Sequence, residues 1–299
     1  MVTHKLCPLC NSSKISLYLK CTDHLISKEE FDLISCSECG LVFTREYPDE
    51  QDIGRYYETD DYISHNDKAE GVLNKVYIVA RKLMLRRKKK IVENATGYKK
   101  GRILDIGCGT GYFPGTMKKG GWDATGIEPN EKARDFGTRR FSIDVLSPER
   151  IAGLPDGSFD AVTMWHVLEH LYDPFDYADE IHRLLKPGGM FLAAVPNCSS
   201  YDAKYYGKFW AAYDVPRHIW HFTPDTFRIF ADKTGFRISG IRTLFPDVFY
   251  ISILSEKHKG KQMYFLSGLI KGMQFYFQSF PEKSKSSSMI YILKSKPRL

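Results

Sequence analysis

The stretch "RILDIGCGTGYFPG", residues 102–115, decides the fold of this chain. An apolar run ends in Asp105, and glycine then stands at every second position, at Gly107, Gly109 and Gly111. The apolar run predicts a buried strand. Glycines permit a sharp turn and let a ligand touch the main chain, and a helix that starts after such a turn offers unpaired N–H groups. The stretch therefore predicts a nucleotide site at the carboxyl end of a strand.

A dinucleotide-binding turn would need the spacing G-x-G-x-x-G. Counted from Gly107, the third position of that motif is Tyr112, and counted from Gly109 it is Pro114. Both registers fail. The stretch fits an acid-x-Gly-x-Gly-x-Gly pattern, which begins at Asp105.

From residue 99 onward the chain alternates between strand-like and helix-like segments. The expected strands are 102–106, 123–127, 141–145, 159–164, 189–195, 236–245 and 288–294. The expected helices are 112–119, 130–138, 166–170, 174–185 and a mixed helical segment over 256–280. This alternation predicts an α/β fold with a parallel sheet covered on both faces.

Three later segments accompany the glycine stretch. "DATGIEPN" places Glu128 at the end of the second strand, and it is followed by "LPDGSFDAVTMWHVLEHLYDP" (154–174) and "EIHRLLKPGGMFLAAVPN" (180–197). Together they resemble the class I S-adenosylmethionine-dependent methyltransferases, over about residues 99–299. The resemblance implies a Rossmann-like seven-stranded sheet with helices on both faces.

The resemblance also implies a cofactor, S-adenosylmethionine, and the residues that bind it. The glycine loop would hold the methionine part, and the acid after the second strand would hold the ribose hydroxyls. Cys108 and Pro129 are assigned to the same site by adjacency. The expected cofactor-binding residues are Asp105, Gly107, Cys108, Gly109, Gly111, Glu128 and Pro129.

Candidate catalytic histidines follow the fourth strand. His166, Glu169 and His170 are spaced i, i+3, i+4, which would put them on one helix face. Three interpretations stay open: a base or substrate contact, a metal site, and a structural role. The segment is similar to that of ubiquinone-pathway O-methyltransferases, where acid-x-x-Glu-His supports magnesium, but His166 stands here at the acidic position, and magnesium prefers oxygen ligands.

A second histidine-rich stretch, "DVPRHIWHFTPDTF", covers residues 214–227. His218 is the preferred proton acceptor, because imidazole suits proton removal near pH 7. Arg217 is a candidate for an anionic substrate group, and His221 for a further substrate contact. Tyr62, in the tyrosine-rich segment "YPDEQDIGRYYETDDYISH" (47–65), would complete the pocket. The alternative for residues 214–227 is a packed connector without a functional role. The alternative for the tyrosine-rich segment is a plain helical linker.

Cysteines are concentrated near the N-terminus. Cys7 and Cys10, then Cys36 and Cys39, form two C-x-x-C pairs. Four thiolates in two short knuckles are typical of a zinc ribbon. The expected organisation is a ribbon over 1–45, a helical linker or cap over 46–98 and a methyltransferase domain over 99–299.

Composition and charge restrict the function. The chain has 299 residues and a net charge of +7, much of it in the basic run 81–90. That run either docks nucleic acid or forms a solvated helix face, and the absence of interleaved aromatics favours the latter. Amino-directed nucleic-acid methyltransferases carry a Pro-Pro motif after the fourth strand, whereas this chain has no Pro-Pro. Nucleic acid is therefore not the expected partner.

These features predict methyl transfer to a small metabolite, such as a sugar nucleotide or a glycan- or lipid-linked intermediate. The alternatives are a nucleic-acid methyltransferase that docks through the ribbon and the basic helix, and a non-catalytic nucleotide-binding protein. No secretory signal and no apolar run of membrane-spanning length is visible, which predicts a cytoplasmic protein. The segment 263–277 either contacts a membrane or lipid-like substrate peripherally or packs on the sheet.

Overall fold

A computed structural model describes residues 1–57 and 72–296, with the backbone alone described for 72–77. Its centre is a seven-stranded sheet in the order β12-β13-β10-β9-β6-β7-β8. The strands are β6 (Arg102–Ile106), β7 (Asp123–Ile127), β8 (Asp144–Leu146), β9 (Phe159–Trp165), β10 (Leu185–Pro196), β12 (Phe236–Thr243) and β13 (Ser288–Ser295). Neighbouring strands from β10 to β8 are parallel, and β13 runs antiparallel to both of its neighbours. The expected seven-stranded α/β sheet is confirmed.

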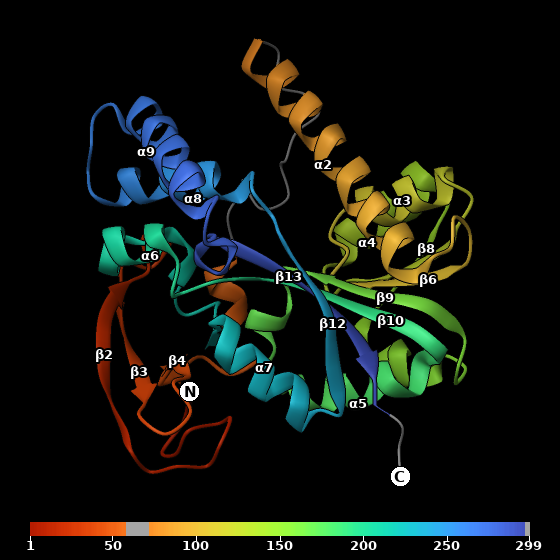
Figure 1. Cartoon of the computed structure of the whole chain (residues 1–299), viewed down its shortest axis with the longest axis horizontal. Coiled ribbons are helices and arrows are strands. Elements are labelled where there is room, and N and C mark those ends of the chain that lie inside the picture. Colours follow the sequence, from red (N-terminus) through yellow and green to blue (C-terminus); the bar gives the residue numbers. More distant parts are fainter. Residues whose placement is uncertain (58–71, 297–299) are drawn as a thin grey trace.

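Both faces of the sheet are covered at its centre, so the central strands β9 and β10 are buried and apolar over most of their length. Ile103 contributes to the core on one face and Leu104 to the core on the other, as the alternation of a strand requires. The helices are α2 (Val72–Thr96), α3 (Tyr112–Lys119), α4 (Glu131–Phe141), α5 (Pro174–Leu184), α6 (Tyr201–Tyr206), α7 (Pro224–Lys233), α8 (Asp247–His258) and α9 (Tyr264–Ser279). Figure 1 shows α2 and α3 on one side of the sheet and α5 and α7 on the other.

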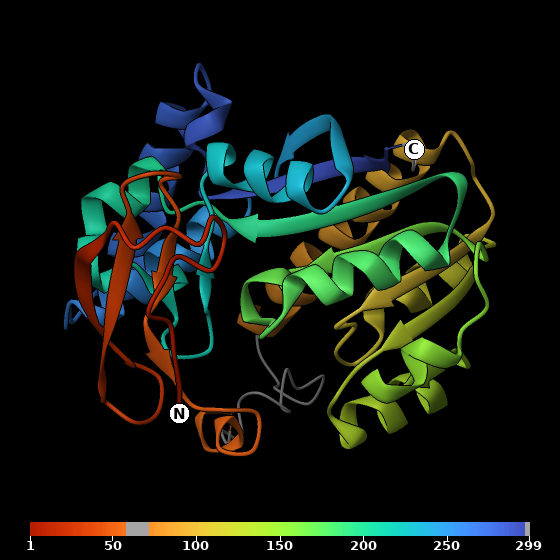
Figure 2. The ribbon, with the colours of Figure 1, turned by 90° about the horizontal axis from the view of Figure 1, so that it is seen from below.

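The N-terminal cysteine segment forms a small sheet that continues into a distant part of the chain. Its order is β11-β4-β3-β2, with β2 (Ile15–Thr22), β3 (Glu30–Cys36), β4 (Val42–Thr44) and β11 (Trp220–His221). A two-stranded sheet pairs β1 (Val2–Thr3) with β5 (Glu46–Tyr47). Figure 2 shows these N-terminal strands at one end of the molecule, with β6 to β8 at the other. The N-terminal segment therefore packs on the stretch that follows β10.

Several expected elements differ from the structure. The strand expected at 141–145 is β8 at Asp144–Leu146, because α4 continues to Phe141. The helix expected at 166–170 is only a 3₁₀ turn, η3 (Leu168–His170). Segment 46–98 is not mostly helical in its first part, where the structure has β5 and a 3₁₀ helix, η1 (Ile53–Tyr56). Segment 256–280 is the end of α8 followed by α9.

The apolar segment 263–277 does not pack on the sheet. α9 packs against α8, and several of its large apolar side chains face outward. Across the described residues we find no helix long and apolar enough to cross a membrane.

Candidate functional site

The glycine loop follows β6 at the edge of the sheet where the parallel strands end. Gly107 has φ +69°, and a Cβ there would lie 2.3 Å from Cγ2 of Val167, so no other residue fits without a shift. The N–H groups of Gly107 and Cys108 donate to the carbonyl of Ile127 at the end of β7, which ties the loop to the next strand. A Cβ on Gly109 would meet nothing within 4 Å. The loop thus offers open space beside bare backbone.

Glu128 lies directly after β7 and is buried. Its carboxylate accepts the N–H of Gly109 at 2.8 Å and the N–H of Asn130 at 3.0 Å. Burial raises the pKa of Glu128, while these two N–H groups oppose the rise. The loop and the acid expected to share a ligand are therefore in direct contact. Pro129 follows in the chain, and Cys108 lies close against Gly126 of β7.

Asp105 is buried below the loop and accepts a hydrogen bond from Oγ1 of Thr163 at 2.6 Å. Burial raises the pKa of Asp105 to about 7, although Thr163 and the nearby Lys88 lower it. A carboxyl with this pKa can gain or lose a proton near neutrality, so a cation placed beside it would hold it ionised.

Lys88 is a site residue that the sequence did not single out. Its ammonium lies 4.6 Å from the ring centre of Trp165, at the end of β9. Burial lowers the pKa of Lys88, while the charges of Asp105 and Asp247 raise it. The basic run was interpreted as a solvated helix face, and at this position that prediction is wrong. The sequence feature that could have indicated Lys88 was the basic run 81–90, which precedes β6.

His166 is held between two carboxylates. Its Nδ1 lies 3.2 Å from Glu169 and its Nε2 lies 2.8 Å from Asp247, the first residue of α8. Burial alone would lower the pKa of His166, but Asp247 and Glu169 outweigh it and raise the pKa to about 10. A protonated imidazole cannot accept a proton at neutral pH. The structure therefore argues against His166 as the base and places it as a cationic link between η3 and α8.

The titration of His166 gives a testable pH dependence. A folded-state pKa of about 10, above the ordinary 6.5, contributes stability that is complete below pH 6.5 and lost as the pH rises through 10. We expect Asp247→Asn to lower the midpoint of thermal unfolding at pH 6 and the difference from the wild type to shrink by pH 10. Scanning calorimetry across this range checks the trend. A constant difference would show that His166 is not held as a cation.

Glu169, His170 and His218 meet on the other side of this turn. One ligand atom of each lies within 4.8 Å of the others, close enough to share a proton or hold a cation. His170 and His218 stack edge to face with ring centres 4.4 Å apart. Oε2 of Glu169 is buried without a hydrogen-bond partner among the described residues. The spacing i, i+3, i+4 suggested a trio with His166, but in the structure His218 takes that place.

The two clustered histidines lie in different surroundings. Burial, together with the charge of His218, lowers the pKa of His170 to about 4, so it is neutral and a weak base at pH 7. Nδ1 of His218 donates to the carbonyl of Ala212 at 2.9 Å, which leaves its Nε2 as the acceptor nitrogen. Nε2 lies 3.9 Å from a carboxylate oxygen of Asp214. His170 has the same tautomer, since its Nδ1 lies 3.1 Å from the carbonyl of Arg217, but its lowered pKa makes it a poor proton acceptor near neutrality, so His218 is the better candidate for a general base.

Arg217 and His221 are occupied inside the protein. The Arg217 side chain is only 4% exposed and donates to the carboxylates of Asp214 and Asp23 and to the carbonyl of Tyr56. His221 is buried, and its Nε2 lies 3.1 Å from Oγ1 of Thr44. These contacts argue against both as substrate ligands, because each side chain joins the N-terminal sheet to the segment after β10. Tyr62 lies outside the described residues.

The four cysteines of the two C-x-x-C pairs converge. Sγ of Cys7 lies 3.5 Å from that of Cys39, and Sγ of Cys10 lies 3.6 Å from that of Cys36. All four sulfurs lie within 4.8 Å of one another. A tetrahedral zinc ion with Zn–S bonds of about 2.3 Å would separate its sulfurs by about 3.8 Å. The donor set and its spacing fit zinc.

A model of the methyltransferase domain matches residues 79–239, more than half of the chain. This chain belongs to the methyltransferase domain family. The match covers the glycine loop, Glu128 and the His218 cluster, and it confirms the resemblance to class I S-adenosylmethionine-dependent methyltransferases. It begins inside α2, so Lys88 also lies within the matched residues.

Among characterised relatives, this methyltransferase is similar to ubiquinone biosynthesis O-methyltransferases. It is 36% identical to that of Paracidovorax citrulli over 104 residues, which cover 32% of this chain and 44% of the relative. It is 32% identical to that of Pseudomonas aeruginosa over 112 residues, 35% of this chain and 48% of the relative. The matches thus span less than half the length of each relative.

Solved structures share the fold of this methyltransferase. A sarcosine dimethylglycine methyltransferase from Galdieria sulphuraria superposes with a TM-score of 0.51 and 13% identity, covering 71% of this chain and 87% of that one. The [4+2]-cyclase SpnF superposes with a TM-score of 0.50 and 18% identity, covering 70% and 80%. At these identities the likeness establishes the fold alone, because one fold serves several reactions.

Proposed function

We propose that this protein transfers a methyl group from S-adenosylmethionine to a hydroxyl group of a small molecule. The observation that carries the proposal is the contact between the glycine loop and the Glu128 carboxylate, beside the cluster that contains His218. An oxygen acceptor is favoured because a hydroxyl needs a base and the relatives are named O-methyltransferases.

The cofactor would bind at the carboxyl ends of β6 and β7. When bound it supplies an activated methyl group for in-line displacement. We assign the ribose hydroxyls to Glu128 and the open backbone at Gly109 to the methionine part. Asp105 and Lys88 carry opposite charges next to this loop, so they suit the ammonium and carboxylate of the methionine moiety.

His218 is proposed as the base that accepts the hydroxyl proton at Nε2. The carbonyl of Ala212 fixes its tautomer, and the Asp214 carboxylate, 3.9 Å from Nε2, would stabilise the imidazolium once the proton arrives. His166, Arg217 and His221 are then positioning residues, since their polar atoms hold η3, α8 and the N-terminal sheet together.

Zinc is proposed at Cys7, Cys10, Cys36 and Cys39, with a structural role. Four thiolates close the coordination sphere and leave no open position for chemistry. The domain boundaries at residues 45 and 98 stay a prediction. β4 of the ribbon pairs with β11, so the ribbon shares a sheet with the part of the chain assigned to the methyltransferase domain.

The acceptor class follows the sequence prediction, a small metabolite such as a sugar nucleotide or a glycan- or lipid-linked compound. Calorimetric titration with S-adenosylhomocysteine, with NAD as the control, tests the proposal first. Binding of the former alone supports it and justifies a screen with labelled cofactor over phenols, nucleotide sugars, lipid phosphates and nucleic acid. Cofactor binding without transfer to any of them favours a non-catalytic nucleotide-binding protein, and transfer to nucleic acid favours the docking alternative.

Replacement of His218 by glutamine should lower kcat by about 100-fold or more, the usual contribution of a positioned base. Binding of S-adenosylhomocysteine should stay unchanged, because the glycine loop is untouched. The matched control is His24→Gln, since His24 stacks on His258 and is not part of the cluster. Initial rates on the acceptor found by the screen provide the measurement. Retained activity would remove His218 from the chemistry.

A further inference from the structure

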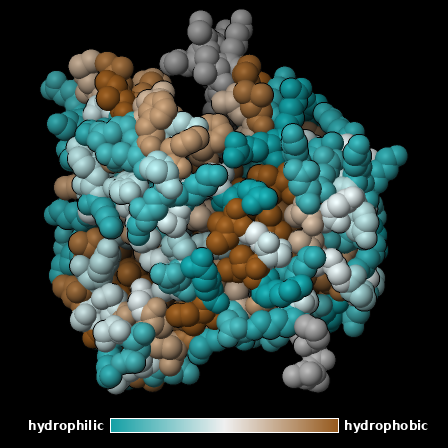
Figure 3. Space-filling model, viewed as in Figure 1, coloured by the Kyte–Doolittle hydropathy of each residue, from teal (hydrophilic) through white to brown (hydrophobic). Residues whose placement is uncertain are grey.

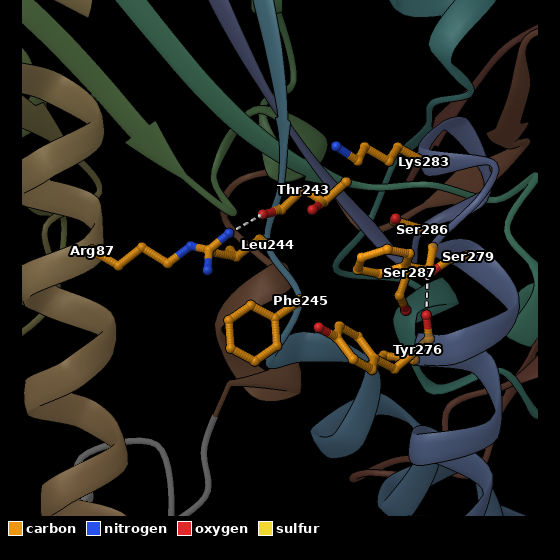
Figure 4. Close-up of a pocket in the computed structure, with 11 residues that line it drawn as sticks. Arg87, Thr243, Leu244, Phe245, Tyr276, Ser279, Lys283, Ser286 and Ser287 are labelled. Atoms are coloured by element: carbon orange, nitrogen blue, oxygen red, sulfur yellow. Dashed lines mark hydrogen bonds between the residues drawn. The ribbon is translucent and has the colours of Figure 1, made fainter. Parts of the chain in front are cut away.

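A cavity of about 230 Å³ lies between α2, the end of β12 and the last turn of α9. Arg87 borders it on one side and Lys283 on the other, and the rings of Phe245, Tyr276 and Phe280 form part of its wall. Figure 4 shows Arg87 reaching across from α2 toward the carbonyl of Thr243, with Lys283 on the opposite side of that strand. The cavity therefore combines two cations with an aromatic wall.

The charge of this cavity is one-sided. Among the described residues that line it, none is acidic. Arg87 donates to the carbonyl of Thr243 at 3.2 Å, and its guanidinium lies 4.7 Å from the ring centre of Phe245. A guanidinium has five N–H donors, so donors remain for a ligand. Guanidinium, ammonium and hydroxyl groups around one space suit a phosphate.

Two segments of the chain contribute both to the cavity and to contacts near the glycine loop. Arg87 and Lys88 are neighbours on α2; Arg87 lines the cavity, while Lys88 interacts electrostatically with Asp105 under the glycine loop. The turn that leads into α8 is the second of these segments. Asp247 binds His166, whereas Phe245 and Val248 line the cavity. Both segments therefore link the cavity to residues near the glycine loop.

An exposed apolar surface leads away from this cavity along α9. Apart from Tyr264, seven large apolar side chains on or just after α9 are exposed, including Ile270 (61%), Phe277 (63%) and Phe280 (67%). At 100° per residue they fall on one side of the helix. The other side, at Gly268 and Gly272, packs closely on α8. Figure 3 shows apolar side chains gathered over α9.

We propose that the cavity and this apolar surface form one binding site for an amphiphilic phosphate ester. The phosphate lies between Arg87 and Lys283, and the hydrocarbon chain lies along α9, with Phe280 common to both parts. The inference rests on the proposed methyl transfer and names its acceptor class, a lipid-linked phosphate. Self-association through this surface is disfavoured, because exposed lysines at 257, 259, 261 and 283 would bring like charges together.

The test is calorimetric titration with dodecyl phosphate below its micelle concentration, with inorganic phosphate and dodecyl maltoside for comparison. We expect dodecyl phosphate to bind at least about 100-fold more tightly than inorganic phosphate. It should also bind much more tightly than dodecyl maltoside, the neutral detergent. Arg87→Ala should weaken it about tenfold or more, whereas Arg86→Ala, an exposed neighbour outside the cavity, should not. Two results would overturn the phosphate assignment. One is equal affinity of Arg87→Ala and Arg86→Ala for dodecyl phosphate, and the other is equal affinity of the wild type for dodecyl phosphate and dodecyl maltoside.

A second pair of variants tests the apolar half. Phe277→Ser should weaken dodecyl phosphate several-fold and leave inorganic phosphate unaffected, while Leu17→Ser, exposed on β2, should change neither. A wild-type dimer in sedimentation that Phe277→Ser dissociates would instead identify an interface between copies and overturn the inference. S-adenosylhomocysteine is titrated into the same samples. If it binds and dodecyl phosphate does not, the inference fails while the proposed function stands.

Discussion

Replacing Glu128 by alanine is expected to weaken binding of S-adenosylhomocysteine by about 100-fold. The carboxylate would accept two ribose hydroxyls, and two charge-assisted hydrogen bonds contribute about 3 kcal/mol together. The same change frees the N–H of Gly109 and the N–H of Asn130, which now donate to Glu128, so the loop also loses one of its links to the end of β7. Calorimetric titration measures the affinity.

The control for Glu128 is Glu131→Ala, which removes a carboxylate from the first turn of α4 and leaves the loop intact. Circular dichroism should show both variants folded, because Glu128 stabilises no core packing. Wild-type affinity in folded Glu128→Ala would refute the ribose assignment. Loss of folding would instead make Glu128 a structural residue, and Glu128→Gln, which keeps one acceptor oxygen, would then separate the two roles.

Replacing Cys39 by serine should release zinc and lower the midpoint of thermal unfolding by about 10 °C or more. A closed zinc site contributes folding free energy directly, and serine is a poor fourth ligand. The loss should extend beyond the ribbon. Oγ1 of Thr44 on β4 donates to the carbonyl of His218, and Asp23 holds Arg217, so activity should fall together with zinc content.

Zinc content by atomic emission and the thermal midpoint are measured on the same preparation. Cys21→Ala is the control, because Cys21 is buried in the N-terminal sheet but is not one of the four converging cysteines. It should keep its full zinc and lose only packing energy. A full zinc complement in Cys39→Ser would contradict the site, and activity that survives zinc loss would show that the ribbon does not position His218.

Local patterns predicted the glycine turn after β6 and the acid that contacts it. The positions of the glycines and of Glu128 follow from strand ends and turn geometry, which depend on neighbouring residues in the chain. The four converging cysteines could also be predicted from the sequence. Two short knuckles supply the four sulfur ligands whatever the conformation of the hairpin between them. Strand ends shifted by a few residues, as at β8, because propensity fixes the existence of an element better than its limits.

The histidine cluster was harder to predict. His166, Glu169 and His170 were expected on one helix face, but His166 has φ +59° and η3 is a short 3₁₀ turn, so the spacing rule for an α-helix did not apply. Lys88 on α2 and Asp247 on α8 lie far apart in the sequence, and their charges interact near Asp105 only in the folded chain. No local pattern could indicate that meeting.

The sequence by itself determined the sheet, the glycine turn with its acid and the cysteine quartet. Each of these depends on periodicity, on backbone freedom or on a short spacing, all of which are local properties of a chain. The tertiary structure decided that His218 keeps Nε2 as an acceptor nitrogen, that Arg217 is buried between two carboxylates, and that α9 leaves an apolar side uncovered. Those outcomes depend on what each side chain meets from distant segments, because burial and neighbouring charge, not residue type, set its protonation and its contacts.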